Sequence, residues 1–205
     1  MIYFFDAWDD NVLDLTKWAS APFDPFLEQN GHLECDNLAH LNLALAIQAG
    51  ALYTANLVGR EVLYKGAVTA AVGGGMADMA ISDGASPGTN NLKLALVWTF
   101  GVPGVEFQWG VNGADSNVFD VAPPVYVGDQ FYQFKIKIIS TSLIEFYIDN
   151  ILVKTWNDPA NPITIEPACF FFASLAYGKY NDFVFQDSVV PSGGTKLNCP
   201  ISMLI

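Results

Sequence analysis

The alternation of apolar and polar residues between positions 131 and 156 constrains the fold of this chain most strongly. Side chains on a β-strand point to opposite faces in turn, so apolar residues at every second position predict a strand with one buried face. A first run has this pattern at Tyr132, Phe134, Ile136 and Ile138. A second run has it at Ile144, Phe146 and Ile148.

Two short polar turns separate these runs from each other and from a third. Residues 140–142 are Ser-Thr-Ser, and Asp149 and Asn150 follow the second run. Asp and Asn tolerate a positive φ, which a two-residue hairpin turn requires. Residues 151–156 then complete a three-stranded antiparallel meander, with one face on a core and the other toward solvent.

Further runs extend the strand prediction over most of the chain. The segments expected to be strands are 32–35, 41–47, 60–71, 92–100, 105–109, 168–175 and 181–186. A helix is the alternative for the Ala/Leu-rich segment 41–47, but its period of two and the following Gly50 favour a strand. A chain of 205 residues with this pattern suits one all-β domain, an antiparallel β-sandwich over residues 1–187.

Residues 188–205 differ from the rest of the chain. They contain two prolines, a Gly-Gly pair and an apolar stretch, so they do not continue the sandwich. We expect this extension to be held either along its own domain or against a neighbouring subunit by strand addition.

Composition excludes several classes of partner. The net charge is −12 and the only arginine is Arg60, so nucleic acid and anionic membranes are poor partners. No apolar run is long enough to span a bilayer, and residues 1–10 lack the pattern of a secretory signal. The hydrophobic content of 52% with 15% charged residues indicates a large core or large protein-facing surfaces. Cys35, Cys169 and Cys199 have no metal-ligand spacing.

Three stretches carry a resemblance to a known superfamily. The hairpin FYIDNILVKTW resembles one in concanavalin A-like lectins and glucanases, where FYIDG is common; Asn150 stands here in place of Gly. DLTKW at 14–18 and NDFVFQ at 181–186 resemble an N-terminal strand and the last strand of the laminarinase-like branch. The resemblance implies a concanavalin A-like jelly roll.

The enzymatic branch of that superfamily needs two carboxylates beside the scissile bond. The branch supplies them from one strand through a Glu-x-Asp-x-(x)-Glu motif, which this chain lacks; Glu106 with Gln108 is the nearest approach. Lyase chemistry would need an Arg, Gln, His and Tyr set, which one arginine and the separate His32 and His40 do not favour. We therefore expect no catalytic activity.

The resemblance also implies a structural calcium in laminarinase-like relatives. Asp182 would be one ligand, with an oxygen near Asp6 as another. Calcium takes hard oxygen ligands, which this acidic chain has.

Two functions remain. The first is a structural subunit of a larger assembly, most consistent with a virion surface such as a bacteriophage decoration, fibre or capsid-surface protein, made without a signal peptide and joined to other subunits through residues 188–205. The second is a carbohydrate-binding module or lectin, and the two are compatible. The candidate sugar-binding residues are Tyr147, Trp98, Trp109, Tyr126, Asp83, Asn90 and Asn91.

Overall fold

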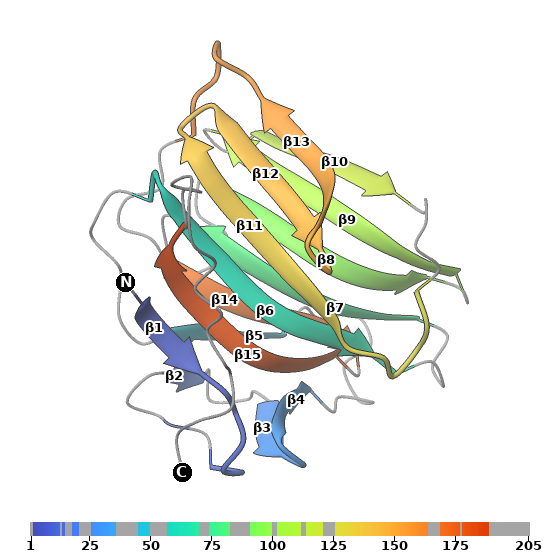
Figure 1. Ribbon diagram of the computed structural model, residues 1–205. Coiled ribbons are helices and arrows are strands. Elements are labelled where there is room, and N and C mark those ends of the chain that lie inside the picture. Colours follow the sequence, from blue (N-terminus) through green and yellow to red (C-terminus); the bar gives the residue numbers. More distant parts are fainter. Residues whose placement is uncertain are drawn as a thin grey trace.

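The computed structural model describes residues 2–12, 14, 18–20, 26–35, 45–49, 57–69, 74–82, 91–99, 102–111, 114–120, 126–163, 169–176 and 178–188. These residues form β-strands and connecting turns, arranged in two antiparallel sheets that lie one in front of the other (Figure 1). Over the same residues no helix occurs that is long and apolar enough to cross a membrane. The all-β, antiparallel sandwich predicted from the alternation is confirmed.

Sheet A contains the meander. Across the sheet its strands are β13 (Ile151–Asn157), β12 (Leu143–Ile148), β11 (Tyr132–Ser140), β6 (Arg60–Val68), β15 (Gly178–Asp187), β4 (His32–Cys35) and β3 (Phe26–Gln29). A further strand, β1 (Ile2–Asp6), pairs with β15 beside β4.

Sheet B lies behind sheet A in Figure 1. Its order is β10 (Ala114–Asp120), β9 (Val102–Val111), β8 (Asn91–Thr99), β7 (Gly74–Ser82), β14 (Cys169–Ala176), β5 (Leu45–Ala49) and β2 (Trp18–Ser20). The strands from β7 to β10 form consecutive hairpins, whereas β14 enters between β7 and β5 from far along the chain.

The meander has the predicted faces. Along β11 and β12 the apolar residues named above are buried, and the residues between them are partly exposed. Asp149 and Asn150 have φ values of 49° and 65°, so the turn has the left-handed backbone that these residue types predicted. A bulge between Phe146 and Tyr147 bends the pairing of β12 with the edge strand β13.

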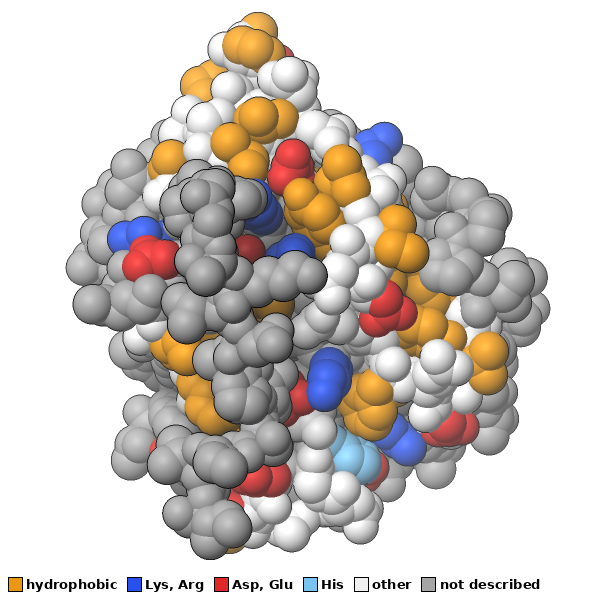
Figure 2. Space-filling model, viewed as in Figure 1, with side chains coloured by type: hydrophobic (Ala, Val, Ile, Leu, Met, Phe, Trp, Pro, Cys, Tyr) orange, Lys and Arg blue, Asp and Glu red, His pale blue; other side chains and the backbone are white. Residues whose placement is uncertain are grey.

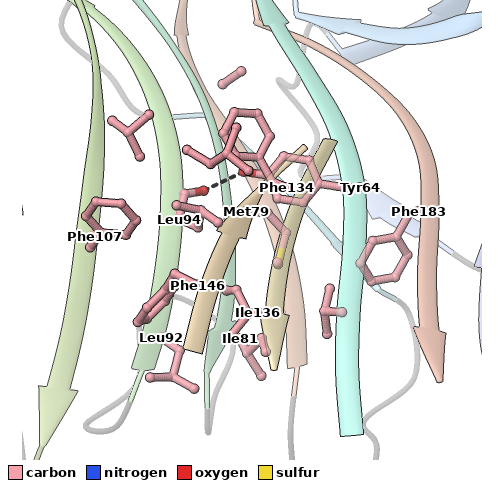
Figure 3. Close-up of a cluster of buried hydrophobic side chains, with 14 of the residues drawn as sticks. Tyr64, Met79, Ile81, Leu92, Leu94, Phe107, Phe134, Ile136, Phe146 and Phe183 are labelled. Atoms are coloured by element: carbon pink, nitrogen blue, oxygen red, sulfur yellow. Dashed lines mark hydrogen bonds between the residues drawn. The ribbon is translucent and has the colours of Figure 1, made fainter. Parts of the chain in front are cut away.

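The core lies between the two sheets and is rich in aromatic side chains (Figure 3). Phe107 of sheet B contacts Phe146 of sheet A edge to face, with ring centroids 5.5 Å apart. The Tyr64 hydroxyl donates a hydrogen bond of 2.6 Å to the Leu94 carbonyl and so also joins the sheets. These contacts fix which side of each sheet is buried, and therefore which side faces outward.

Candidate functional site

The outward side of sheet B can be assigned from its buried side. Buried side chains occur at alternate positions of β7, β8 and β9: Ala77, Met79, Ile81, Leu92, Leu94, Val105 and Phe107. Because successive strand residues lie on opposite faces, the positions between them belong to the outward face.

The pairing register places polar residue types beside apolar ones on this outward face, with Phe119 paired with Glu106 and Ala173 paired with Asp78. Asp78 is paired with Ala95, and Ala95 is paired with Glu106, so these three positions form one row across β7, β8 and β9. In the next row Lys93 of β8 is paired with Gln108 of β9, which is paired with Asn117 of β10. We call the positions Asp78, Lys93, Glu106, Gln108 and Asn117 the polar face.

The residue types of the polar face suit a neutral ligand with many hydroxyl groups. Carboxylates accept hydrogen bonds, the ammonium of lysine donates them, and side-chain amides do both. Alanine stands in both rows, at Ala95 and at Ala80, which is paired with Lys93.

Asp78 of the polar face could not be found from the sequence spacing. Asp78 and Glu106 lie on strands separated only by β8, but their positions are distant along the chain. Two strand spacings put their backbones about 10 Å apart. Glycosidases place their two carboxylates about 5–5.5 Å apart for retention and about 6.5–9.5 Å apart for inversion. A search for acidic pairs within one strand does not find a pair that lies on two different strands.

The other sequence candidates that the structure describes lie on different elements. Tyr126 is 4% exposed and packs edge to face against Tyr132 with ring centroids 5.0 Å apart, so it belongs to the core. Trp98 and Trp109 occupy strand positions in phase with the buried residues of β8 and β9. Asn91 begins β8 opposite Gly110, at one end of the polar face. Asp83 and Asn90 lie outside the described residues.

Tyr147 lies on the outward face of sheet A. Its hydroxyl donates a hydrogen bond of 2.5 Å to Glu145, and the Lys135 ammonium lies 4.3 Å from the centre of its ring. The hydrogen bond to Glu145, with burial and the negative charges of Glu145 and Glu61, raises the pKa of the Tyr147 phenol to about 12. A ring in contact with an ammonium group offers a sugar less of its surface than a free platform would.

The expected calcium ligands are neighbours, but other groups already occupy their oxygens. Asp6 is paired with Phe183, next to Asp182 in the bulge of β15. The Asp182 carboxylate lies 2.5 Å from the Lys65 ammonium, and Asp6 accepts a 3.3 Å hydrogen bond from the backbone N–H of Trp8. Among the described residues no group of three or more His, Cys, Asp or Glu side chains could hold a metal. The Lys65 ammonium competes with a calcium ion for the Asp182 carboxylate.

Comparisons with known proteins give matches at the level of structure alone. No protein-family model matches the chain, and no curated protein has a significantly similar sequence. A structure from work on endo-acting O-glycanases of the human gut microbiota, which initiate mucin breakdown, has a TM-score of 0.68 at 12% identity, covering 91% of this chain and 99% of the other.

Two further structures support the same fold. The catalytic domain of an endo-1,3-beta-glucanase (laminarinase) from Thermotoga petrophila has a TM-score of 0.65 at 11% identity, covering 91% of this chain and 98% of the other. A Bacillus subtilis protein of unknown function with a galectin-like fold has a TM-score of 0.67 at 12% identity, covering 91% and 96%. The chain therefore has the concanavalin A-like jelly-roll fold that the hairpin sequence indicated.

Proposed function

We propose that this chain is a non-catalytic, glycan-binding subunit of a larger assembly, with the polar face of sheet B as its binding surface. The register that gathers Asp78, Lys93, Glu106, Gln108 and Asn117 on one face carries this proposal. Two of the structurally similar proteins are named for action on glycans, which supports a glycan as the ligand class. Fold alone does not decide function, so the polar face is the stronger support.

The absence of catalysis is part of the proposal. The single-strand arrangement of carboxylates used by the glucanase branch is missing from the sequence. Within the two described rows of the polar face, the register brings together one acidic pair, Asp78 and Glu106. Measuring product release from any bound glycan tests this part directly.

The assembly is the second part of the proposal, and a virion surface is the setting that we favour. Few charged residues and a high hydrophobic content support burial of surface between chains. Exposed apolar side chains on sheet A support it further, including Ile2 and Phe5 of β1 and Ile151 and Leu152 of β13. Other subunits of the particle are the proposed protein partners, and host glycans are the proposed ligands.

A broad glycan-binding screen of the full chain, run with calcium and with a chelator, tests the proposed function. We expect specific binding in both conditions, because Lys65 already pairs with Asp182. We also expect no cleavage of any bound glycan over a long incubation. A folded chain that binds no glycan would contradict the binding proposal, and cleavage that Glu106→Gln abolishes would show an enzyme instead.

A further inference from the structure

An apolar patch lies on the outward face of sheet A beside the end of β15. It is formed by Ile2, Phe5, Leu63 and Val184, which we call the β1–β15–β6 patch. Val184 is paired with Phe5 on one side and with Leu63 on the other. Ile2 and Phe5 are 60% and 50% exposed, and Leu63 and Val184 are half-buried. Figure 2 shows hydrophobic side chains among charged ones on this side of the molecule.

Polar pairs border the patch along the strands. Lys65 and Asp182 form an ion pair of 2.5 Å on one side. On the other side, in the same row as Ile2, Gln186 donates a 2.8 Å hydrogen bond to Glu61. An apolar centre with a polar rim is the usual composition of a surface that another protein segment covers.

The chain leaves sheet A close to this patch. The backbone N–H and the hydroxyl of Ser188 both donate hydrogen bonds to the Gly59 carbonyl, of 2.8 and 2.9 Å. Ser188 follows Val184 by four residues, or about 13 Å of strand. Residues 189–205 therefore start within about 13 Å of an apolar surface that they could cover.

The length of residues 189–200 allows residues 201–205 to reach the patch of a neighbouring copy. The strongly apolar stretch is ISMLI at 201–205, and residues 189–200 precede it with Gly193–Gly194 and two prolines. An extended spacer of that length reaches about 40 Å. A compact domain of this size has a radius of gyration of about 17 Å and hence a diameter of about 43 Å. The spacer is thus far longer than the path to the chain's own patch and similar to the width of one domain.

We infer that residues 201–205 of one copy dock on the β1–β15–β6 patch of the next copy. This inference rests on the assembly part of the proposed function and names the surface that the assembly would use. Exchange between two copies would give a closed dimer, and one-way donation would give a ring or a filament. In either case the polar face of sheet B stays outside the contact, because it belongs to the opposite sheet.

Disulfide trapping in the full chain tests this inference. Cys199 lies next to the docking residues, so a cysteine introduced by Val184→Cys should be within reach of it, after Cys35→Ser and Cys169→Ser remove the other thiols. Isotopically labelled and unlabelled copies are mixed, oxidised at low concentration and digested. The masses of the cross-linked peptides are then measured by mass spectrometry. Thr155→Cys, on the exposed part of edge strand β13, is the matched control. If Val184→Cys impairs folding, Phe5→Cys replaces it.

We expect cross-linked peptides that combine a labelled with an unlabelled half for Val184→Cys, and none for the control. Peptides with both halves from the same copy would overturn the inference, because the segment would then cover its own domain. No cross-link at all, in a chain that light scattering shows to be assembled, would also overturn it while the assembly proposal stands. A wild-type chain that is monomeric at every concentration would instead contradict the assembly proposal itself.

Discussion

Tyr147 is a residue type that often binds sugars, but its contacts with neighbouring side chains decide what it can bind. The sequence puts it on the polar side of a strand, which the structure agrees with. The alternation does not reveal that Lys135 of β11 pairs with Tyr147 in the sheet and lies over its ring. Nor does it reveal that Glu145, two residues earlier on the same face, accepts a hydrogen bond from the phenol. Contacts across strands decide what such a residue can bind.

The raised phenol pKa gives a pH prediction for Tyr147. Its pKa is 10.0 in an unperturbed chain and about 12 here, so between these values the folded state holds the proton more tightly than the unfolded state. The resulting stabilisation is complete below about pH 10 and is lost as the pH rises through about 12. In an ultraviolet titration, the difference between wild type and Tyr147→Phe should show one late-ionising phenol. In Glu145→Ala that phenol should ionise closer to pH 10, and an unchanged midpoint would show that Glu145 is not the cause.

Lys65 gives a second prediction at this scale. If its ammonium replaces a metal at Asp182, calcium and a chelator should give the same melting temperature for the wild type. Lys65→Gln should cost up to about 1 kcal/mol, as partly exposed ion pairs do, and calcium should restore part of the loss. Lys179→Gln, which removes the exposed pair with Asp129, is the control and should not respond to calcium. A wild-type melting temperature that rises with calcium would show that the ion displaces Lys65.

At the scale of the elements, strands with strong alternation could be predicted and strands without it could not. β11 and β12 were predicted because every second residue is apolar, and β13 was predicted because it follows the two-residue turn at Asp149 and Asn150. β7 begins with two glycines and has only a short alternation, from Ala77 to Ile81, and β10 is ADSNVFD, which has no such run. Neither strand was expected. Both become strands because hairpin partners on β8 and β9 complete their hydrogen bonds.

The polar face was missed for a related reason. Asp78 lies on β7, one of the strands that the sequence did not predict, and its relation to Glu106 exists only through the pairing of both strands with β8. Sequence spacing detects residues that share one strand. Residues brought together across a sheet need the strand order, which a single sequence does not contain.

The turn between β12 and β13 gives a prediction for a single element. Asn150 has a φ of 65°, where a residue with a β-carbon is strained unless it is Asn or Asp. We expect Asn150→Ala to lower the free energy of unfolding by about 1 kcal/mol and Asn150→Gly to change it by less than about 0.5 kcal/mol. Urea unfolding of the two variants measures both. Equal losses would mean that the side-chain contacts of Asn150 with Gln133 and Lys135, rather than its backbone, stabilise the turn.

At the scale of the whole molecule, each sheet carries one of the two proposed binding surfaces. The outward face of sheet B bears the polar face, and the outward face of sheet A bears the exposed apolar residues near the start of residues 189–205. Since the core lies between them, a substitution on one outward face should leave the other unchanged.

Deletion of residues 191–205 tests whether glycan binding and assembly use separate surfaces. We expect the truncated chain to keep its fold and its glycan binding but to lose assembly, because the deleted residues follow the last strand, β15. Light scattering measures particle mass, and circular dichroism checks the fold. A truncated chain that still assembles would remove these residues from the contact.

The most direct test of the central claim is a binding titration of the best glycan from the screen against variants of the two outward faces. Gln108→Ala and Asn117→Ala change the polar face, and Glu145→Ala is the matched control on sheet A. Because each loss leaves a sugar hydroxyl without its partner, we expect each polar-face variant to bind about tenfold more weakly, or by about 1.4 kcal/mol, with the control unchanged. Unchanged binding by both polar-face variants, with loss in the control, would contradict the claim and move the site to sheet A.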